Sequence, residues 1–419
     1  MSSLASILSD LGNEIIGYDD YKGKTETEKE LQKRNIKIVN DVDYLTDEYT
    51  LIYTSAISKD HELIKKAKEL NIKMYEYYEF IGEFIKDYET ISISGTHGKT
   101  TTTAMLSKVL NEAIGCSYII GDGTGNVNKN TNILVLESCE YKRHFLSYYP
   151  KYTIITNIDL DHVDCYNDIE DIIKAFQEFV DRTSTKVIAC GDDLNTKKLV
   201  SDKIIYYGLN DDNDIRATNI EYTKDGSSFD CIINNELFGR FNLHIYGKHM
   251  IQNALAVIYM ASLYNIESNI INKILNKFTG AKRRFSEEKV NDVVLVDDYA
   301  HHPVEIKTVI DHARQKYKDK EVVGVLIPYT YSRVKAFYKE FAKVMNLCDY
   351  SYVTDIEPAR EKQENYKNIT KEMIISITNN CEALDEKTIN KLYKHKNAVI
   401  LFLGCKDPRW LIDAYKKGL

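Results

Sequence analysis

The sequence lacks the features that mark secreted, membrane-spanning and nucleic-acid-binding proteins. Its 8 cysteines are scattered and none forms a CxxC pair, so it indicates neither a zinc ribbon nor a disulfide framework. No apolar run approaches the roughly 18 residues of a membrane span, and residues 1–4 lack the start of a signal peptide. The net charge of −8 argues against a general nucleic-acid surface. We therefore expect a protein of the reducing cytoplasm, without a membrane span.

What the sequence does contain is enough material for two or three folded domains. It has 419 residues, of which 43% are hydrophobic and 28% charged, an ordinary balance for a globular protein. We find no internal repeat and no low-complexity linker. The boundaries are expected in short hinges near residue 88 and near residues 279–280, which gives domains 1–88, 89–279 and 280–419.

Residues 1–88 read as alternating helices and strands. Apolar spacing predicts helices at 2–11 and 60–70 and strands at 14–18 and 50–54. The acidic pair Asp19-Asp20 after a strand is a feature of dinucleotide-binding folds, which begin with a strand and a glycine-rich turn. That opening is absent here, and without the central strand two strand edges would be unpaired. We expect the missing part upstream of residue 1; the alternative is a damaged domain.

The rest of the chain reads as two further α/β units. Short β-branched runs predict buried parallel strands at 89–94, 133–137, 152–157 and 187–190, then at 293–296, 322–326, 350–354 and 399–402. Residues 218–241 alternate more and contain the turn signals Gly226 and Asn234-Asn235, which is typical of an antiparallel flap. Residues 247–264 predict a helix.

The most informative segment is a glycine turn between a strand and a helix. Glycines let backbone N–H groups approach an oxyanion, and the helix N-terminus adds positive potential. Lys99 can reach the terminal phosphates of a nucleotide, and the Thr100 hydroxyl can bind Mg²⁺. Two residues separate the glycines instead of the usual four, so a polar helix cap is the alternative. The expected phosphate-binding residues are Gly95, Thr96, His97, Gly98, Lys99, Thr100 and Thr101.

Polar residues follow two other predicted strands of the middle domain. Glu137 ends a strand, where open α/β sheets bind ligands, and is a candidate Mg²⁺ ligand or water-positioning residue. Asp159, Asp161, His162 and Asp164 follow the strand near residue 155. Mg²⁺ prefers oxygen ligands, whereas zinc would need more nitrogen or sulfur partners. A solvated strand end is the alternative for Glu137.

Two charged segments stand in the C-terminal domain. Residues 280–285 contain adjacent arginines, which suit polyphosphate binding, although a solvated basic turn would look the same. Residues 297–303 place two acids and two histidines after a strand and before a helix that Pro303 begins, which suggests a site.

Together and in this order, these segments resemble the Mur ligase family, closest to its L-alanine-adding branch in the Firmicutes-like form. Seven motifs in register cover essentially the whole chain. They are residues 95–103, 120–126, 137–149, 156–164, 249–256, 280–285 and 297–303.

The resemblance implies UDP-sugar-binding, ATP-binding and amino-acid-binding domains, the first and third Rossmann-like. It implies that L-alanine is joined to the lactyl carboxylate of UDP-N-acetylmuramate through an acyl phosphate, with ATP and Mg²⁺, in peptidoglycan synthesis. Thr100, Glu137 and His162 match the family's Mg²⁺ ligands. ATP touching two domains would require closure about the hinge near residue 280. The resemblance further places Asn253 near the adenine, Arg284 and Asp298 on the nucleotide, and Arg333 in the catalytic set.

Departures from the family pattern concern both substrates. The glycine loop expected for the UDP pyrophosphate is missing. Ile327, Tyr329 and Lys335 replace the usual Gln, His and Arg, and a lysine does not reproduce the bidentate fork of an arginine. Phe176 falls where several relatives carry a carbamylated lysine. Two alternatives therefore stay open: a related ligase acting on a folate or peptide carboxylate, and a nucleotide-binding scaffold or pseudo-ligase that has lost its donor site.

Overall fold

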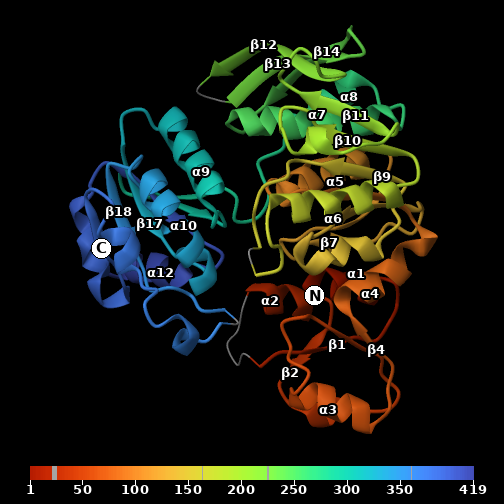
Figure 1. Ribbon diagram of the computed structural model, residues 1–419, viewed down its shortest axis with the longest axis horizontal. Coiled ribbons are helices and arrows are strands. Elements are labelled where there is room, and N and C mark those ends of the chain that lie inside the picture. Colours follow the sequence, from red (N-terminus) through yellow and green to blue (C-terminus); the bar gives the residue numbers. More distant parts are fainter. Residues whose placement is uncertain (21–25, 163, 224–225, 360) are drawn as a thin grey trace. The chain divides into compact units, whose positions relative to one another are not determined.

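The computed structural model describes residues 1–20, 26–162, 164–223, 226–359 and 361–419, which form two compact units (Figure 1). Unit 1 comprises residues 1–219, 229–241 and 252–277, and unit 2 comprises residues 220–228, 242–251 and 278–419. The domain boundaries near 88 and 279 stay predictions. The α/β class and the three-domain architecture are confirmed by the sheets below and by the relatives reported with the site.

The N-terminal part of unit 1 contains two separate parallel strand pairs. β1 pairs with β2, and β3 pairs with β4. The two pairs are separate two-stranded sheets in the described part of the chain. The elements are α1 (Ser2–Asp10), β1 (Ile16–Tyr18), α2 (Glu26–Gln32), β2 (Lys37–Val39), β3 (Leu51–Tyr53), α3 (Glu62–Glu69), β4 (Met74–Glu76) and α4 (Tyr77–Phe84).

A ten-stranded sheet carries the candidate site. Its order is β14-β13-β12-β11-β10-β9-β5-β8-β6-β7, and β5 is parallel to both β8 and β9. The carboxyl ends of these three strands therefore meet at one edge. The strands are β5 (Glu89–Ser94), β6 (Ser117–Ile119), β7 (Gly125–Asn126), β8 (Ile133–Glu137), β9 (Tyr152–Ile155), β10 (Lys186–Cys190), β11 (Ile204–Gly208), β12 (Ile215–Thr223), β13 (Gly226–Ile233) and β14 (Glu236–Leu243).

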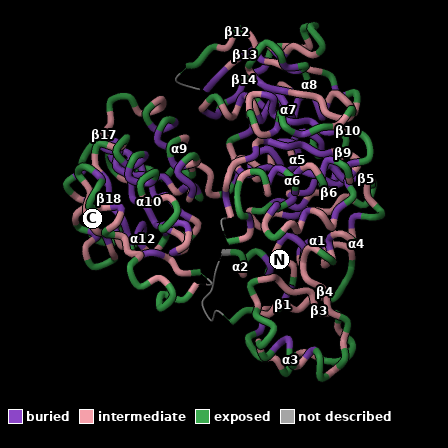
Figure 2. The backbone as a smooth tube through the Cα atoms, in the orientation of Figure 1, coloured by how far each residue is buried: buried purple, intermediate pink, exposed green. Residues whose placement is uncertain are grey.

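Helices cover both faces of the central strands. α5 (Lys99–Ala113) packs against β5, β6 and β8, and its apolar side chains stay outside the cluster that α6 (Ile169–Arg182) forms on the other face. α6 buries Phe176 completely in that cluster, with its ring 5.2 Å from the ring of Phe145. The strands are correspondingly buried along their length (Figure 2). Phe176 is thus a core residue.

The flap predicted at 218–241 consists of β12, β13 and β14, which lie side by side. Asn234 and Asn235 join β13 to β14, with φ of 50° and 68°. Two successive positive φ values are the geometry of a type I′ hairpin turn, which matches strand twist. Gly226, the other predicted turn residue, begins β13, and residues 224–225 before it lie outside the described residues. The helices that complete unit 1 are α7 (Lys248–Ser262), whose first turn belongs to unit 2, and α8 (Ser268–Leu275).

Unit 2 is a six-stranded sheet in the order β15-β16-β20-β17-β18-β19, and all its neighbours are parallel except β15 and β16. α9, α10 and α11 cover one face, and a 3₁₀ segment (Glu386–Lys394) and α12 cover the other. The elements are β15 (Ser286–Val290), β16 (Val293–Asp298), α9 (Pro303–Lys316), β17 (Glu321–Leu326), α10 (Tyr331–Met345), β18 (Tyr350–Val353), α11 (Glu372–Ile375), β19 (Cys381–Ala383), β20 (Ala398–Leu403) and α12 (Arg409–Lys417).

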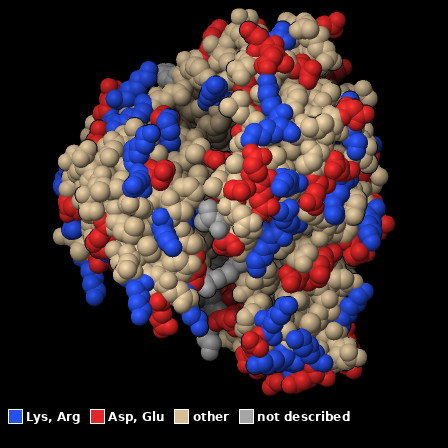
Figure 3. Space-filling view, in the orientation of Figure 1, with Lys and Arg blue, Asp and Glu red and all other residues tan. Residues whose placement is uncertain are grey.

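The structure shows two features related to the hydropathy and charge of the sequence. Across the described residues, every helix is too short or too polar to cross a bilayer. Basic and acidic side chains are interspersed on the face shown in Figure 3, instead of gathering into a surface of one sign.

Candidate active site

The glycine turn begins where β5 ends and leads into α5. Gly98 is the residue before α5 and has φ of 83°, which L side chains rarely adopt. A Cβ there would lie 3.4 Å from the side-chain oxygen of Asn253, whose residue is 6% exposed. Asn253 therefore lies beside the turn, and its contact with adenine stays a prediction.

Asn157, which sequence reasoning did not single out, holds the turn in place. Its side-chain oxygen accepts the His97 N–H at 2.8 Å, and its amide donates to the His97 carbonyl at 2.9 Å. Its own carbonyl accepts the Thr96 N–H at 3.0 Å. Because these N–H groups are bonded within the protein, the N–H groups that could receive a phosphate are those at the start of α5, which have no partner within the helix. Binding of a phosphate by residues 98–101 stays a prediction.

Lys99 is the cation of the site and already has an anionic partner. Its Nζ lies 3.0 Å from Oε1 and 2.9 Å from Oε2 of Glu140, a residue only 1% exposed. Burial opposes the charge of Lys99, but the Glu140 carboxylate outweighs it and raises the pKa of Lys99 above its ordinary value. Sequence reasoning missed Glu140. The available signal was its place three residues after Glu137.

The Thr100 hydroxyl and the Glu137 carboxylate meet at the carboxyl edge of the sheet. Thr100 donates to Oε1 of Glu137 at 2.8 Å, and the Gly121 N–H donates to Oε2 at 2.6 Å. A Cβ on Gly121 would lie 2.6 Å from that carboxylate, so only glycine fits without displacement. The motif at 120–126 therefore places Glu137.

The cluster at 156–164 divides into separate roles. His162, with φ of 52°, places Nε2 3.6 Å from Oε1 of Glu140. Asp161 accepts the His162 N–H at 2.7 Å, and Asp164 accepts the Tyr141 hydroxyl at 3.1 Å. The Asp159 N–H donates to the Thr96 hydroxyl at 2.8 Å. Residue 163 lies outside the described residues.

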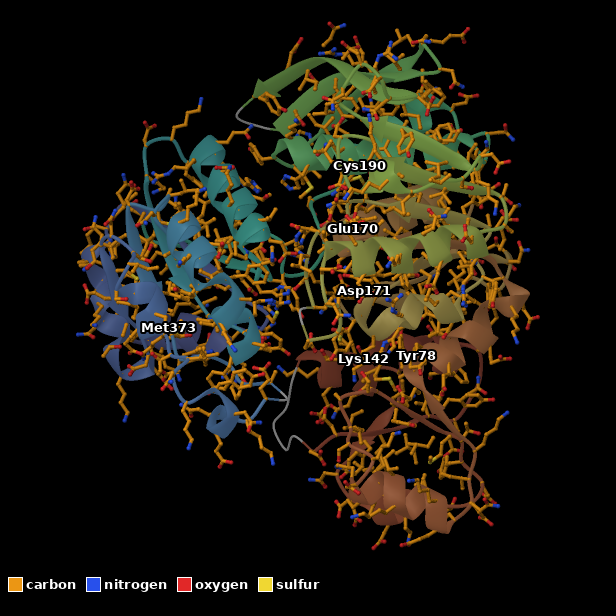
Figure 4. All side chains as sticks on the ribbon, viewed as in Figure 1. Tyr78, Lys142, Glu170, Asp171, Cys190 and Met373 are labelled. Carbon is orange, nitrogen blue, oxygen red and sulfur yellow. The ribbon has the colours of Figure 1, made fainter. Side chains whose placement is uncertain are left out.

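The loop between Glu140 and Tyr148 shapes this side of the site. Lys142 and Arg143 both have left-handed backbone, with φ of 49° and 59°. Arg143 pairs with Asp171 of α6 at 2.5 Å, and the His144 ring stacks on Tyr78 of α4 at 4.2 Å. Figure 4 labels Lys142 on this loop, Tyr78 on α4 and Asp171 on α6. The loop is thus anchored to two helices.

The oxygens of Thr100 and Glu137 fit a magnesium ion. A hydroxyl and a carboxylate oxygen 2.8 Å apart, at the start of a helix that can receive phosphates, are ligands Mg²⁺ prefers. The third predicted ligand, His162, lies beside Glu140. Its role toward a metal stays a prediction.

In unit 2 the two adjacent arginines have different roles. Arg283 forms bonds of 3.0 to 3.1 Å with both oxygens of Asp297 and donates to the carbonyls of residues 404–406. This arginine therefore ties the segment before β15 to the end of β20. The guanidinium of Arg283 is thus used by the fold, and contact of the arginine pair with a polyphosphate stays a prediction.

Asp298 organises the segment that carries Arg284. It is 4% exposed and accepts the N–H groups of Phe285 and Ala300, both at 2.8 Å. Arg284 lies 3.8 Å from it. Burial raises the pKa of Asp298 to about 6, against the opposing effect of Arg284. Direct contact of Arg284 and Asp298 with a nucleotide stays a prediction.

The altered stretch 327–335 follows β17 at the same edge as Asp298. Thr330 has φ of 62°, an uncommon value for a β-branched residue, and its hydroxyl accepts the Arg333 N–H at 3.4 Å. Arg333 is 7% exposed. Burial raises the pKa of Cys405 to about 12, and the positive charge of Arg333 opposes this rise. The Tyr329 ring lies 6.5 Å from that of His301. The predicted catalytic role of Arg333 stays a prediction.

A glycine turn that leads from a central parallel strand into a helix beginning Lys-Thr defines a P-loop type of nucleotide-binding protein. Comparison with known domain families agrees over nearly the whole chain. The Mur ligase family catalytic domain matches residues 1–89, the Mur ligase middle domain residues 93–261, and the Mur ligase glutamate ligase domain residues 283–405. The chain belongs to the Mur ligase family, whose members are ATP-dependent amide-forming ligases.

Solved structures of similar fold include three ligases. UDP-N-acetylmuramate–alanine ligase MurC of Thermotoga maritima is 24% identical with a TM-score of 0.81, over 100% of this chain and 95% of that one. A murein peptide ligase of Psychrobacter arcticus is 23% identical with a TM-score of 0.74, over 99% and 96%. MurF ligase of Thermotoga maritima, in complex with ADP, is 16% identical with a TM-score of 0.66, over 90% and 96%. At these identities the likeness shows the fold.

Proposed function

We propose that this protein is an ATP-dependent ligase that joins L-alanine to the lactyl carboxylate of UDP-N-acetylmuramate through an acyl phosphate. The observation that carries the proposal is the meeting of Thr100 and Glu137, 2.8 Å apart, beside the charged Lys99 at the start of α5. A cation and a pair of metal-type oxygens at a helix N-terminus suit the transfer of a phosphoryl group.

The chemistry explains why the site needs this charge. A carboxylate and a triphosphate repel one another, so acyl phosphate formation requires positive charge where they meet. Lys99 supplies one such charge, and the N–H groups of residues 98–101 supply partial charges. Thr100 and Glu137 would hold Mg²⁺, which neutralises charge on the phosphates when bound. The amine then attacks the acyl carbon and phosphate leaves.

The test is an assay of phosphate release with ATP, Mg²⁺, UDP-N-acetylmuramate and L-alanine. We expect release to require both substrates and Lys99→Ala to abolish it. Lys108→Ala is the matched control, because Lys108 lies on the same helix and pairs with Glu112 at the surface. Release that ignores the substrates, or normal turnover by Lys99→Ala, would count against the proposal.

A second candidate is a ligase that accepts a peptide in place of L-alanine. The altered stretch with Tyr329 and Lys335 favours it, and the similar murein peptide ligase has the same fold. A panel of acceptors containing L-alanine and short murein peptides distinguishes the two, because the preferred acceptor gives the highest kcat/KM. A panel in which no acceptor stimulates phosphate release would favour a nucleotide-binding scaffold.

A further inference from the structure

We propose that Glu140 is a positioning residue for phosphoryl transfer, which tethers the ammonium group of Lys99 and fixes how far it extends toward the transferred group. The inference rests on the proposed ligase function and adds a carboxylate to it. It is carried by the contacts of Lys99, the burial of Glu140 and the anchoring of its loop.

The ammonium group of Lys99 is fully engaged in the structure. Its three hydrogens face the carbonyls of Gly95 and Thr96, at 2.5 and 3.0 Å, and the carboxylate of Glu140 at 2.9 and 3.0 Å. A phosphate oxygen can gain Lys99 only by replacing one of these acceptors. The carbonyls belong to the turn itself, so they are the acceptors that a nucleotide can replace at least cost.

Glu140 is the acceptor that cannot be given up. Its side chain is 2% exposed, and its backbone carbonyl accepts the Tyr166 hydroxyl and the Arg143 N–H. The carboxylate is thereby held in the interior, where loss of its cation would leave a buried unpaired charge. Lys99 therefore stays paired with Glu140 while it binds phosphate. The position of that carboxylate then sets how far the ammonium group can extend. His162, 3.6 Å from Glu140, faces the same anion.

Because Glu140 is negatively charged, we expect it to affect ATP binding and catalysis differently. A carboxylate beside a triphosphate repels it, so Glu140 does not add to the affinity for ATP. Its benefit comes in the transition state, where charge on the transferred phosphoryl group requires a correctly placed cation. A residue needed only for folding would lower kcat and the affinity for ATP together.

The first experiment compares Glu140→Gln with Glu140→Asp in the intact protein, by steady-state kinetics and by calorimetric titration with ATP. We expect Glu140→Gln to lower kcat by about 10-fold or more. Its Kd for ATP should be unchanged or lower, and Glu140→Asp, which keeps the charge, should recover part of the rate. Glu178→Gln on α6 is the matched control, because Glu178 is exposed and 3.6 Å from Arg143. An unchanged kcat, or equal losses in kcat and affinity, would overturn the tether.

A binding measurement tests the tether even where the ligase assay fails. Lys99→Ala leaves the Glu140 carboxylate near the phosphates without its cation. The double variant Lys99→Ala with Glu140→Gln should then bind ATP about 5-fold or more tightly than Lys99→Ala alone. Equal affinities would overturn the tether. Wild-type protein that binds ATP but never releases phosphate would instead overturn the ligase function.

Discussion

The side-chain amide of Asn157 brackets the backbone of His97, accepting its N–H at 2.8 Å and donating to its carbonyl at 2.9 Å. The side chain of Asn157, just after the end of β9, thus pairs with the backbone of the turn after β5 as a neighbouring strand would. This pairing keeps the turn in one shape before any nucleotide arrives.

These two hydrogen bonds predict that Asn157→Ala weakens ATP binding as well as the fold. Loss of two hydrogen bonds, each contributing about 1 kcal/mol, frees the turn and should lower ATP affinity about 10-fold or more. Titration calorimetry measures the affinity, and thermal unfolding measures the fold. Asn167→Ala is the control, because Asn167 is exposed and bonds only locally to Asp171. Equal affinities of the two variants would contradict the role given to Asn157.

Gly121→Ala should impair the use of magnesium. The added methyl group would lie 2.6 to 2.7 Å from the Glu137 carboxylate and must displace it from Thr100. We expect the Mg²⁺ concentration for half-maximal phosphate release to rise about 10-fold, since a misplaced ligand costs more than 1 kcal/mol. A magnesium titration of turnover checks this. An unshifted midpoint would remove Glu137 from the metal site.

The neighbouring arginines should differ sharply under the same substitution. Arg283→Lys loses the fork on Asp297 and most bonds to residues 404–406, so the free energy of unfolding should fall by about 2 kcal/mol. Arg284→Lys should leave stability nearly unchanged and raise KM for ATP. Urea unfolding and steady-state kinetics separate the two outcomes. A reversed pattern would mean that the fold and the nucleotide use the opposite members of the pair.

Two histidines in unit 2, the buried His312 and the half-buried His249, should make the protein less stable in acid. Burial lowers the pKa of His312 to about 3, and of His249 to about 4, from the ordinary 6.5. Below pH 6.5 the unfolded chain binds more protons than the folded one, so the stability present at neutral pH is lost as pH falls. The loss between pH 6.5 and pH 5 is about 1.6 kcal/mol for each histidine.

The substitution His312→Phe isolates this effect. The His312 ring stacks between Tyr246 and Phe285, at 4.8 and 3.5 Å, where a phenyl ring fits. The variant should lose the part of the fall in unfolding free energy between pH 6.5 and pH 5 that His312 contributes, about 1.6 kcal/mol. His244→Phe, at an exposed position of the segment that carries Tyr246, should keep the whole fall. An unchanged slope in His312→Phe would show that its titration does not differ between the two states.

Sequence patterns predicted the elements that depend on residues close together in the chain. The buried runs that became β5, β8 and β9, and the asparagine pair between β13 and β14, follow from β-branched residues and from tolerance of positive φ. The strands β2 and β4 were missed because, unlike β1 and β3, they do not stand in a longer apolar run that shows a period.

Parts of the site could not be predicted because they depend on the path of the backbone. Glu140 meets Lys99 from a loop that has left-handed residues at 142 and 143, which no periodicity reveals. Arg283 and Arg284 are adjacent residues of the same type, so the sequence does not distinguish them. Only the fold shows which of them pairs with Asp297. Asn157 gains its role from a strand more than fifty positions earlier in the chain.

The saturated ammonium group of Lys99 has a consequence for selectivity. A small free anion, such as inorganic phosphate, makes one contact, which does not compensate for the loss of a short hydrogen bond between Lys99 and a carbonyl. A nucleotide that also accepts hydrogen bonds from several N–H groups of the helix does compensate for it. We therefore expect the site to bind simple anions weakly and to make Lys99 available to a ligand that binds at several points at once.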